Sequence, residues 1–176
     1  MSAAALRPAI EGDLAAIQRL YAHHVMTGSA SFEETPPDLP EIMRRWRGVA
    51  DAGLPYVVAE RAGEILGYAY AGPYRPRSAY RFSVEDSIYL APAAQGQGLG
   101  KALLSRLITD CEALGKRQMI AVIGDSANLA SVNLHRALGF RTTGAFEAIG
   151  FKFGRWVDSV LMQRALGPGS GSLPTL

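Results

Sequence analysis

The sequence has little cysteine, histidine or net charge, and each shortage excludes a class of protein. Its single cysteine, Cys111, excludes an intramolecular disulfide. The three histidines, His23, His24 and His135, have no nearby cluster of acidic residues, so the sequence indicates no metal site. The 18 Lys and Arg exceed the 16 Asp and Glu by only two charges. That excess is too small to indicate binding to nucleic acid or to an acidic membrane surface.

Long apolar runs are also missing. No stretch approaches the roughly 20 apolar residues that span a bilayer, and residues 1–7 lack the charged start and apolar core of a secretory signal. We therefore expect a cytoplasmic protein without membrane contact. The 176 residues, 48% of them hydrophobic, suit one globular domain over residues 1–166. A flexible tail rich in Gly, Ser and Pro is expected over residues 167–176.

Helical and strand-like patterns alternate along the rest of the chain. Asp13 and Asp38 precede apolar stripes at helical spacing, and we expect them to cap two N-terminal helices. Two further helices are expected over residues 98–114, with Cys111 as a buried hydrophobe, and over residues 128–138. Strands are expected near residues 4–10, 55–60, 65–70, 83–90 and 118–123, with two more over 140–163 that turn near 150–154. This order predicts a mixed α/β fold, with a central seven-stranded sheet flanked by helices.

A glycine-rich turn joins the strand over residues 83–90 to the helix over residues 98–114. Glycines let the backbone curl around a ligand, and the free N–H groups at a helix start suit a phosphate or pyrophosphate. A nucleoside triphosphate loop is disfavoured, because Gln95 replaces its first glycine and Ala102 its hydroxyl residue. A dinucleotide fingerprint fails too, since Lys101 stands at the place of its third glycine.

The turn instead has the pattern Gln-x-x-Gly-x-Gly at Gln95, Gly98 and Gly100. In this pattern the chain resembles the GNAT acetyltransferases, whose corresponding turn binds the pyrophosphate of acetyl-CoA. The resemblance implies the GNAT acyl-CoA N-acyltransferase fold, with acetyl-CoA as co-substrate and no metal. It assigns to the cofactor Ile88, Tyr89, Leu90, Gln95, Gly96, Gln97, Gly98, Leu99, Gly100, Lys101, Asn128 and Ser131.

A second stretch, from Asn128 through Ser131 and His135 to residues 138–140, is similar to the part of GNAT proteins that contacts the pantetheine arm. His135 stands where that family commonly has a Tyr. By this resemblance His135 could protonate the leaving CoA thiolate, act as the general base, or be structural.

Several stretches resemble the phosphinothricin and methionine sulfone/sulfoximine acetyltransferases more closely, namely residues 70–75, 84–90, 121–123 and 150–158. This likeness implies a small amino-acid-like amine as acceptor and a homodimer. Its last hairpin, with Lys152, Phe153 and Trp156, would help to close the pocket and form the dimer contact, although core and hairpin roles are equally open. The implied substrate-binding residues are Phe32, Arg75, Pro76, Arg77, Glu85, Asp86 and Ser87.

The chemistry of such an acceptor agrees with these residues. The guanidinium groups of Arg75 and Arg77 can bind its carboxylate and other oxygens, although an arginine-rich loop can equally be a solvated surface. Glu85 matches the position of the family's catalytic glutamate and is the best candidate for the base that frees the amine. In a regular strand Asp86 would face the opposite side. A backbone N–H near Tyr89 and Leu90 would stabilise the charge that develops on the thioester oxygen.

Two alternatives stay open at this point. One is a GNAT enzyme for a different amine, a polyamine or a protein N-terminus. A polyamine pocket should carry carboxylates, whereas this loop carries Arg75, Arg77 and Arg81, and a peptide would need an open groove. The other is a non-catalytic acetyl-CoA-binding module, which would be indifferent to Glu85→Gln.

Overall fold

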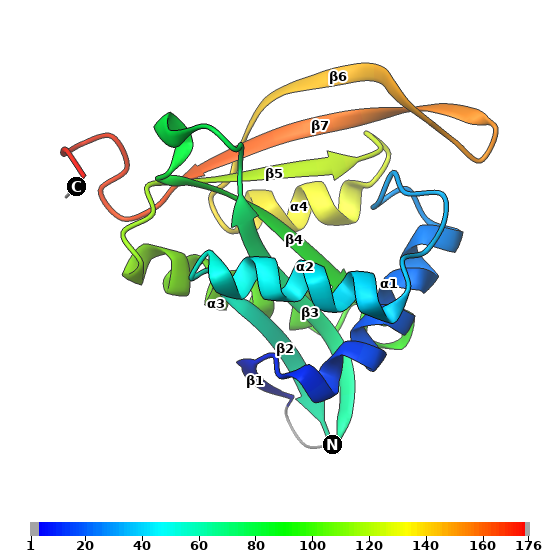
Figure 1. Ribbon diagram of the computed structural model, residues 1–176. Helices are drawn as coiled ribbons and strands as arrows, with labels where there is room; N and C mark the ends of the chain where they lie inside the picture. Colours follow the sequence, from blue (N-terminus) through cyan, green and yellow to red (C-terminus); the bar gives the residue numbers. More distant parts are fainter. Residues whose placement is uncertain (1–3, 175–176) are drawn as a thin grey trace.

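A computed structural model describes residues 4–174 and shows the mixed sheet that the sequence predicts (Figure 1). The sheet has seven strands in the spatial order β1-β2-β3-β4-β5-β7-β6. β4 and β5 pair in parallel, and the other neighbours pair antiparallel. The strands are β1 (Ala5–Pro8), β2 (Tyr56–Arg61), β3 (Glu64–Pro73), β4 (Ser83–Leu90), β5 (Gln118–Gly124), β6 (Arg141–Lys152) and β7 (Arg155–Ala165).

Four α-helices cover the two faces of the sheet (Figure 1). α1 (Leu14–Thr27) and α2 (Leu39–Asp51) lie on one face, and α3 (Leu99–Ala113) and α4 (Leu129–Ala137) lie on the other. Strand residues alternate between two cores, because successive side chains point to opposite faces: Val58 packs with α1, whereas Ala59 packs with α3. Cys111 is fully buried in the α3 core, as predicted. No helix within residues 4–174 is both long and apolar enough to cross a membrane.

The two predicted helix caps have different outcomes. Asp38 caps α2 as expected, with its Oδ1 accepting the backbone N–H of Glu41 at 2.9 Å. The cap predicted at Asp13 is wrong, because its side chain makes no capping bond to α1. Its carboxylate accepts two hydrogen bonds from the Arg7 guanidinium, at 2.7 and 2.8 Å, and one from the N–H of Ile10. The Arg7 guanidinium on β1 binds the Asp13 carboxylate more strongly than the amides of α1 would, and this contact links β1 to the start of α1.

The parallel pair β4–β5 separates partway along its length. Its register runs from Ser83 opposite Gln118 to Asp86 opposite Ala121 and ends there, so residues 87–90 of β4 have no partner in β5. On the other side β4 stays paired with β3 up to Leu90. A gap therefore opens in the sheet beside the second half of β4.

The β3–β4 register determines which backbone groups face this gap. The N–H of Ala91 donates to the carbonyl of Leu66 at 2.8 Å, which continues the register of the ladder. Hydrogen-bonded and non-hydrogen-bonded pairs alternate in an antiparallel ladder, so the odd-numbered residues of β4 bond to β3. Ile88 and Leu90 consequently turn their N–H and C=O groups toward the gap. Tyr89 uses its N–H and C=O groups in the ladder with Tyr68 of β3.

The described part of the C-terminal tail, residues 167–174, forms turns beside the start of β5. The Arg117 guanidinium donates to the carbonyls of Gly169, Ser172 and Leu173 at 3.2, 3.4 and 3.2 Å. One arginine thus contacts several points of a segment whose composition alone predicts flexibility.

Candidate active site

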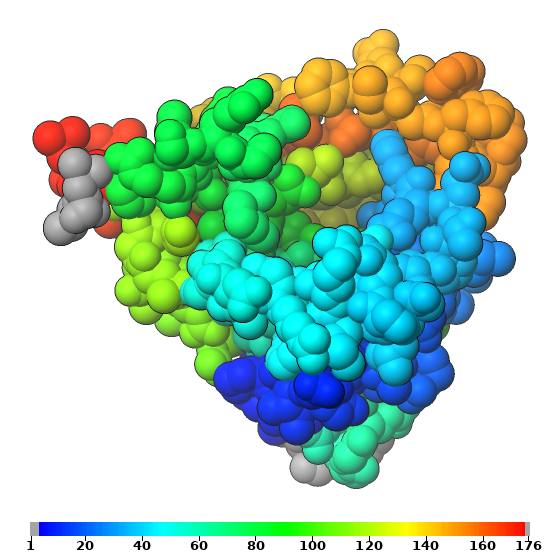
Figure 2. Space-filling view, viewed as in Figure 1, coloured from blue at the N-terminus to red at the C-terminus, as the bar shows by residue number. Residues whose placement is uncertain are grey.

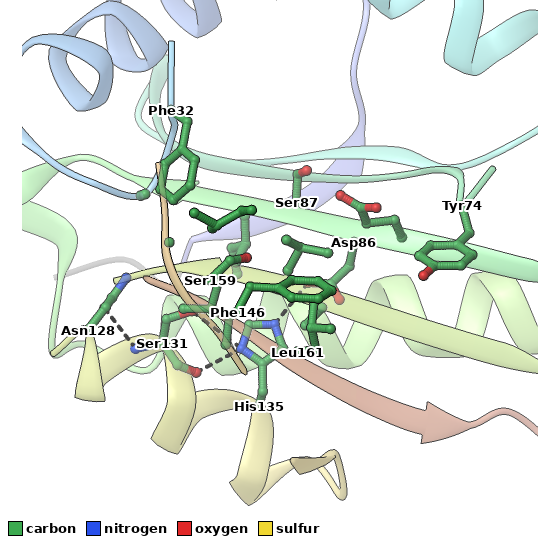
Figure 3. Close-up of a pocket in the computed structure, with 18 of the residues that line it drawn as sticks. Phe32, Tyr74, Asp86, Ser87, Asn128, Ser131, His135, Phe146, Ser159 and Leu161 are labelled. Atoms are coloured by element: carbon green, nitrogen blue, oxygen red, sulfur yellow. Dashed lines mark hydrogen bonds and ion pairs between the residues drawn. The ribbon is translucent and has the colours of Figure 1, made fainter. Parts of the chain in front are cut away.

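A cleft of about 560 Å³ occupies the gap between β4 and β5. Figure 2 shows the hollow between the green segment around residues 74–80, the blue α1–α2 segment and the orange β6–β7 hairpin. Figure 3 shows side chains entering it from several elements, among them Phe32 from the α1–α2 segment and Phe146 from β6. Predicted site residues that line the cleft are Phe32, Arg75, Glu85, Asp86, Ser87, Ile88, Tyr89, Asn128, Ser131 and His135.

Other predicted residues lie outside the cleft lining. Pro76 and Arg77 are exposed in the segment between β3 and β4. The glycine-rich turn lies beyond Leu90, the last residue of β4, where α3 begins. Its residues Gln95, Gly96, Gln97, Gly98 and Lys101 are exposed, whereas Leu99 and Gly100 are buried.

The turn before α3 has the backbone geometry of an anion site. Gly96 and Gly98 have φ of 72° and 80°, a left-handed conformation that L side chains rarely adopt, and Gly98 occupies the N-cap of α3. The amides of the first helical turn lack intrahelical partners and carry the positive end of the helix dipole. A 15-residue helix starting at Leu99 therefore presents N–H groups to an anion. The residues present fit the pyrophosphate group expected there.

Glu85 and Asp86 face opposite sides of the sheet, as the strand period predicts. Glu85 is partly buried on the same face as α1 and α2, near Arg75. Burial and the charge of Asp86 raise the pKa of the Glu85 carboxyl, and the positive charge of Arg75 works against this rise. The pKa of Glu85 therefore moves toward the range of a general base that works near neutral pH.

Asp86 lies on the other face and pairs with His135 of α4 (Figure 3). Its Oδ2 is 2.9 Å from His135 Nε2, and the two side chains are each 2% exposed. His135 Nδ1 donates to the carbonyl of Ser131 at 2.7 Å, which leaves Nε2 for the carboxylate. Burial lowers the pKa of His135, but the hydrogen bond and charge of Asp86 outweigh burial and raise it. A buried contact between His135 and Asp86 thus joins α4 to β4 beside the cleft.

Asn128 fixes the start of α4. Its Oδ1 accepts the backbone N–H of Ser131 at 3.2 Å, which caps the helix. Figure 3 shows Asn128, Ser131 and His135 successively along α4 beside the cleft. α4 therefore presents polar groups along one wall of the gap.

His24 is a neighbour of the site that sequence reasoning missed. Its Nε2 lies 2.8 Å from the carbonyl of Leu90, and its ring contacts that of Tyr89, with centroids 5.4 Å apart. Burial lowers the pKa of His24, which favours the neutral ring with its proton on Nε2. The sequence signal was the helical position of His24, because successive residues of a helix point in different directions. His23 is exposed, whereas His24 turns inward from α1.

These features together are those of an acyl-CoA-dependent N-acetyltransferase: an interrupted parallel pair, a helix start beside it that suits an anion, and the partly buried carboxyl of Glu85 lining the cleft. Residues 17–140 match the Acetyltransferase (GNAT) family, and the chain belongs to that family. Among the described residues 4–174, no group of three or more His, Cys, Asp and Glu could hold a metal ion.

Within this family, the chain is similar to acetyltransferases named for small amino-acid analogues. The chain is 58% identical over 172 residues to phosphinothricin N-acetyltransferase of Alcaligenes faecalis, covering 98% of this chain and 87% of that one. It is 40% identical over 161 residues to the L-methionine sulfoximine/L-methionine sulfone acetyltransferase of Salmonella typhimurium, covering 92% and 94%. A crystal structure of a GNAT superfamily phosphinothricin acetyltransferase from Sinorhizobium meliloti in complex with AcCoA superposes with a TM-score of 0.96 at 52% identity, covering 99% and 94%.

Proposed function

We propose that this acetyltransferase moves the acetyl group of acetyl-CoA to the α-amino group of a small amino-acid analogue. The acceptors are of the phosphinothricin, methionine sulfone or methionine sulfoximine type, and transfer occurs directly in a ternary complex. One observation carries this proposal: a cation and a carboxylate, Arg75 and Glu85, both line the cleft, and the charge of Arg75 acts on the Glu85 carboxyl. An α-amino acid carries the complementary pair of charges. The relatives that act on such compounds support the same acceptor class.

Acetyl-CoA supplies an activated thioester when it is bound. The amides at the start of α3 would hold its pyrophosphate, with Gln95, Gly96 and Gln97 in the turn and Lys101 on the first helical turn as further contacts. Ile88 would offer backbone hydrogen bonds to its pantetheine arm, because the β3–β4 ladder leaves its N–H and C=O groups facing the gap.

Glu85 is the general base in this proposal. The acceptor amine is protonated at neutral pH and must lose a proton before it attacks. The raised pKa of Glu85 and its position beside Arg75 suit a carboxylate that first pairs with the ammonium and then takes its proton. His135 is a poor base here, because Nδ1 faces the Ser131 carbonyl and Nε2 faces Asp86. We therefore assign Asp86 to the pair with His135 rather than to the acceptor.

The N–H of Leu90 is the best-placed backbone donor for the charge that develops on the thioester oxygen. The neighbouring Tyr89 has its N–H in the ladder with β3. His24 holds the carbonyl of the same Leu90. This bond fixes the peptide plane that follows Leu90 and so helps to hold the end of β4 in place.

The proposal also covers the oligomeric state of the protein and the compartment in which it works. More than half of each of the residues Phe151, Phe153 and Trp156 near the hairpin tip is exposed, at 57–65%. A cluster of large exposed aromatics on one hairpin suits contact with a second copy of the chain. We propose a homodimer that works in the cytoplasm, where acetyl-CoA is available, and that detoxifies amino-acid analogues.

Release of CoA from acetyl-CoA in the presence of five amines tests this function. The amines are methionine sulfone, methionine sulfoximine, phosphinothricin, spermidine and a peptide that begins with alanine. Saturable activity on the first three alone is expected. Activity confined to spermidine or the peptide would keep the cofactor and overturn the acceptor class, and silence on all five would favour a non-catalytic acetyl-CoA-binding module.

A further inference from the structure

Lys152, the last residue of β6, is a buried lysine without a salt-bridge partner among residues 4–174. Its residue exposure is 2%, and Nζ donates to the backbone carbonyls of Gly28 and Ser31 at 2.8 and 2.6 Å. Burial lowers the pKa of the ammonium group, and the charges of Glu33 and Glu34 oppose this only partly. Burying an ammonium group is costly unless hydrogen bonds compensate. The two carbonyls that compensate belong to the segment between α1 and α2.

The same segment carries Phe32, whose ring rests on bare backbone at two glycines. A Cβ at Gly124, the last residue of β5, would lie 2.9 Å from the Phe32 ring and 2.0 Å from the carbonyl oxygen of Ser29. A Cβ at Gly150 of β6 would lie 2.6 Å from the ring. Any side chain at either position would displace the ring or the segment. Figure 3 shows Phe32 extending from this segment over the cleft.

A third contact holds the segment at its centre. Ser29 Oγ donates to Asp125 Oδ2 at 3.2 Å, and Arg155 of β7 pairs with the same carboxylate. Residues 28–32 are therefore held between the end of β5 and the β6–β7 hairpin. The N–H of Gly28 still donates to the carbonyl of His24 at the end of α1, and Ser31 Oγ lies 2.8 Å from Tyr21 Oη. Beyond Gly28 the segment belongs to no helix or strand, so its conformation depends largely on side-chain contacts.

We propose that Lys152 is a positioning residue that sets the size of the acceptor pocket through Phe32. By fixing the carbonyls of Gly28 and Ser31, it presses the Phe32 ring against Gly124 and Gly150, where the ring closes one end of the cleft. The pocket then takes a small amino-acid-like amine and excludes acceptors that extend past the ring, such as a peptide. This inference rests on the proposed function for its acceptor class, although the contacts themselves do not depend on it.

Steady-state kinetics of Lys152→Met and Phe32→Ala, singly and combined, test the coupling. Loss of the two charged hydrogen bonds in Lys152→Met should raise KM for methionine sulfone about tenfold or more, with kcat and KM for acetyl-CoA changed less than about threefold. In the Phe32→Ala background the same substitution should leave the acceptor KM nearly unchanged, because the group through which Lys152 acts is gone. Lys116→Met is the matched control, since Lys116, which is only partly buried, also donates to a carbonyl, that of Arg81.

Gly150→Ala provides an independent route in case Lys152→Met folds poorly. It displaces the ring while leaving the ammonium group in place, and its rise in acceptor KM should also disappear in Phe32→Ala. The proposal would be overturned if each substitution raised the acceptor KM as much in the Phe32→Ala background as in the wild type. Parallel changes in kcat and in both KM values would overturn it as well.

Hydrogen–deuterium exchange separates this inference from the acceptor assignment. The amides of residues 28–33 should exchange faster in Lys152→Met than in the wild type, and Lys116→Met should show no change there. If the wild-type enzyme acetylates none of the amino-acid analogues, the proposed function fails while faster exchange still supports the positioning role. Unchanged exchange in Lys152→Met would overturn the positioning role whatever the acceptor is.

Discussion

Glu85 and Asp86 are neighbours in the chain with different partners, because β4 turns successive side chains to opposite faces. Glu85 lies on the side of Arg75, and Asp86 lies on the side of α4 and pairs with His135. Each carboxylate therefore has its own environment and its own role. Glu85 serves proton transfer on one face, and Asp86 attaches α4 to β4 on the other.

Glu85→Gln should lower kcat about 10²- to 10⁴-fold, because the amide keeps the shape of the side chain but cannot take a proton. KM for acetyl-CoA should change little. Initial rates at saturating acceptor measure this effect, with Glu64→Gln, an exposed glutamate at the start of β3, as control. A kcat within threefold of the wild type would rule out Glu85 as the base.

Arg75→Gln should move the acid limb of kcat/KM to higher pH. The charge of Arg75 opposes the rise in the pKa of Glu85, so removing it raises that pKa further, and the base is ionised only above its pKa. Rate profiles between pH 5 and 8 measure the shift. Arg77→Gln should leave the limb in place, because Arg77 lies outside the cleft lining. The Glu85 assignment would be contradicted by an unmoved limb in Arg75→Gln.

Asp86→Asn should destabilise the fold by about 1.5–3 kcal/mol, the range for a hydrogen bond to a charged group, and the loss should depend on pH. The pKa of His135 is raised in the folded state, so the pair's contribution is full below the unfolded value of about 6.5. It fades as the pH rises through the folded pKa. Urea unfolding between pH 6 and 9 measures this, and a difference between variant and wild type that grows with pH would contradict the assignment.

At the scale of elements, the cofactor site depends on how β4 passes into α3. The strand ends, a three-residue 3₁₀ turn over Pro92–Ala94 follows, and two left-handed glycines deliver the chain to the helix. The gap that starts after Asp86 and the helix start at Leu99 thus belong to one continuous segment. The geometry of this segment decides where a long ligand can lie.

Gly98→Ala should cost about 1–2 kcal/mol, because an L side chain must adopt the left-handed conformation there, and it should raise KM for acetyl-CoA. Thermal unfolding and steady-state kinetics measure the two effects. Gly48→Ala, at an exposed and unhindered position inside α2, should instead stabilise the protein by about 1 kcal/mol. Equal effects of the two substitutions would show that the left-handed turn at Gly98 has no special role.

The elements around the site can be predicted from sequence because their signals are local. The predicted strand Ser83–Leu90 is correct to the residue, and the predicted helix after the glycine turn is correct within one residue at each end. Alternation, apolar spacing and caps all lie within a few positions of each other. The pairs that build the site are distant in sequence. Asp86 and His135 are 49 residues apart, His24 and Leu90 are 66 apart, and Lys152 and Ser31 are 121 apart.

Such pairs have no local signature. The histidines have no acidic cluster near them in the sequence, yet β4 brings Asp86 to His135. Asp13 has the residue type of a helix cap, yet Arg7 takes its carboxylate. In both cases a charged partner from another element provides a stronger contact than the local backbone offers.

At the scale of the whole molecule, the β6–β7 hairpin links the cleft to the outer surface. Its inner residues Phe146 and Ile149 line the cleft, and its tip carries Phe151 and Trp156, whose rings pack edge to face at 5.2 Å. The hairpin therefore connects the acceptor pocket to the surface proposed for the dimer.

Trp156→Glu should convert the dimer to a monomer, because a charge would enter a surface whose apolar area drives association. Sedimentation velocity across a range of protein concentrations measures the change, and Lys116→Glu, outside the hairpin, is the control. A wild type that sediments as a monomer at all concentrations would contradict the homodimer.

Recognition of an α-amino acid by both of its charges underlies the function proposed for the cleft. It is measured by kcat/KM of the wild type and of Arg75→Gln for methionine sulfone and for its methyl ester, which keeps the amine but lacks the carboxylate. We expect the wild type to prefer the free acid about ten- to hundredfold, the worth of one charged hydrogen-bonded pair, and Arg75→Gln to lose that preference. Equal kcat/KM of the wild type for the ester and the acid would show that Arg75 does not bind the acceptor carboxylate. A preference for the free acid that survives in Arg75→Gln would show the same.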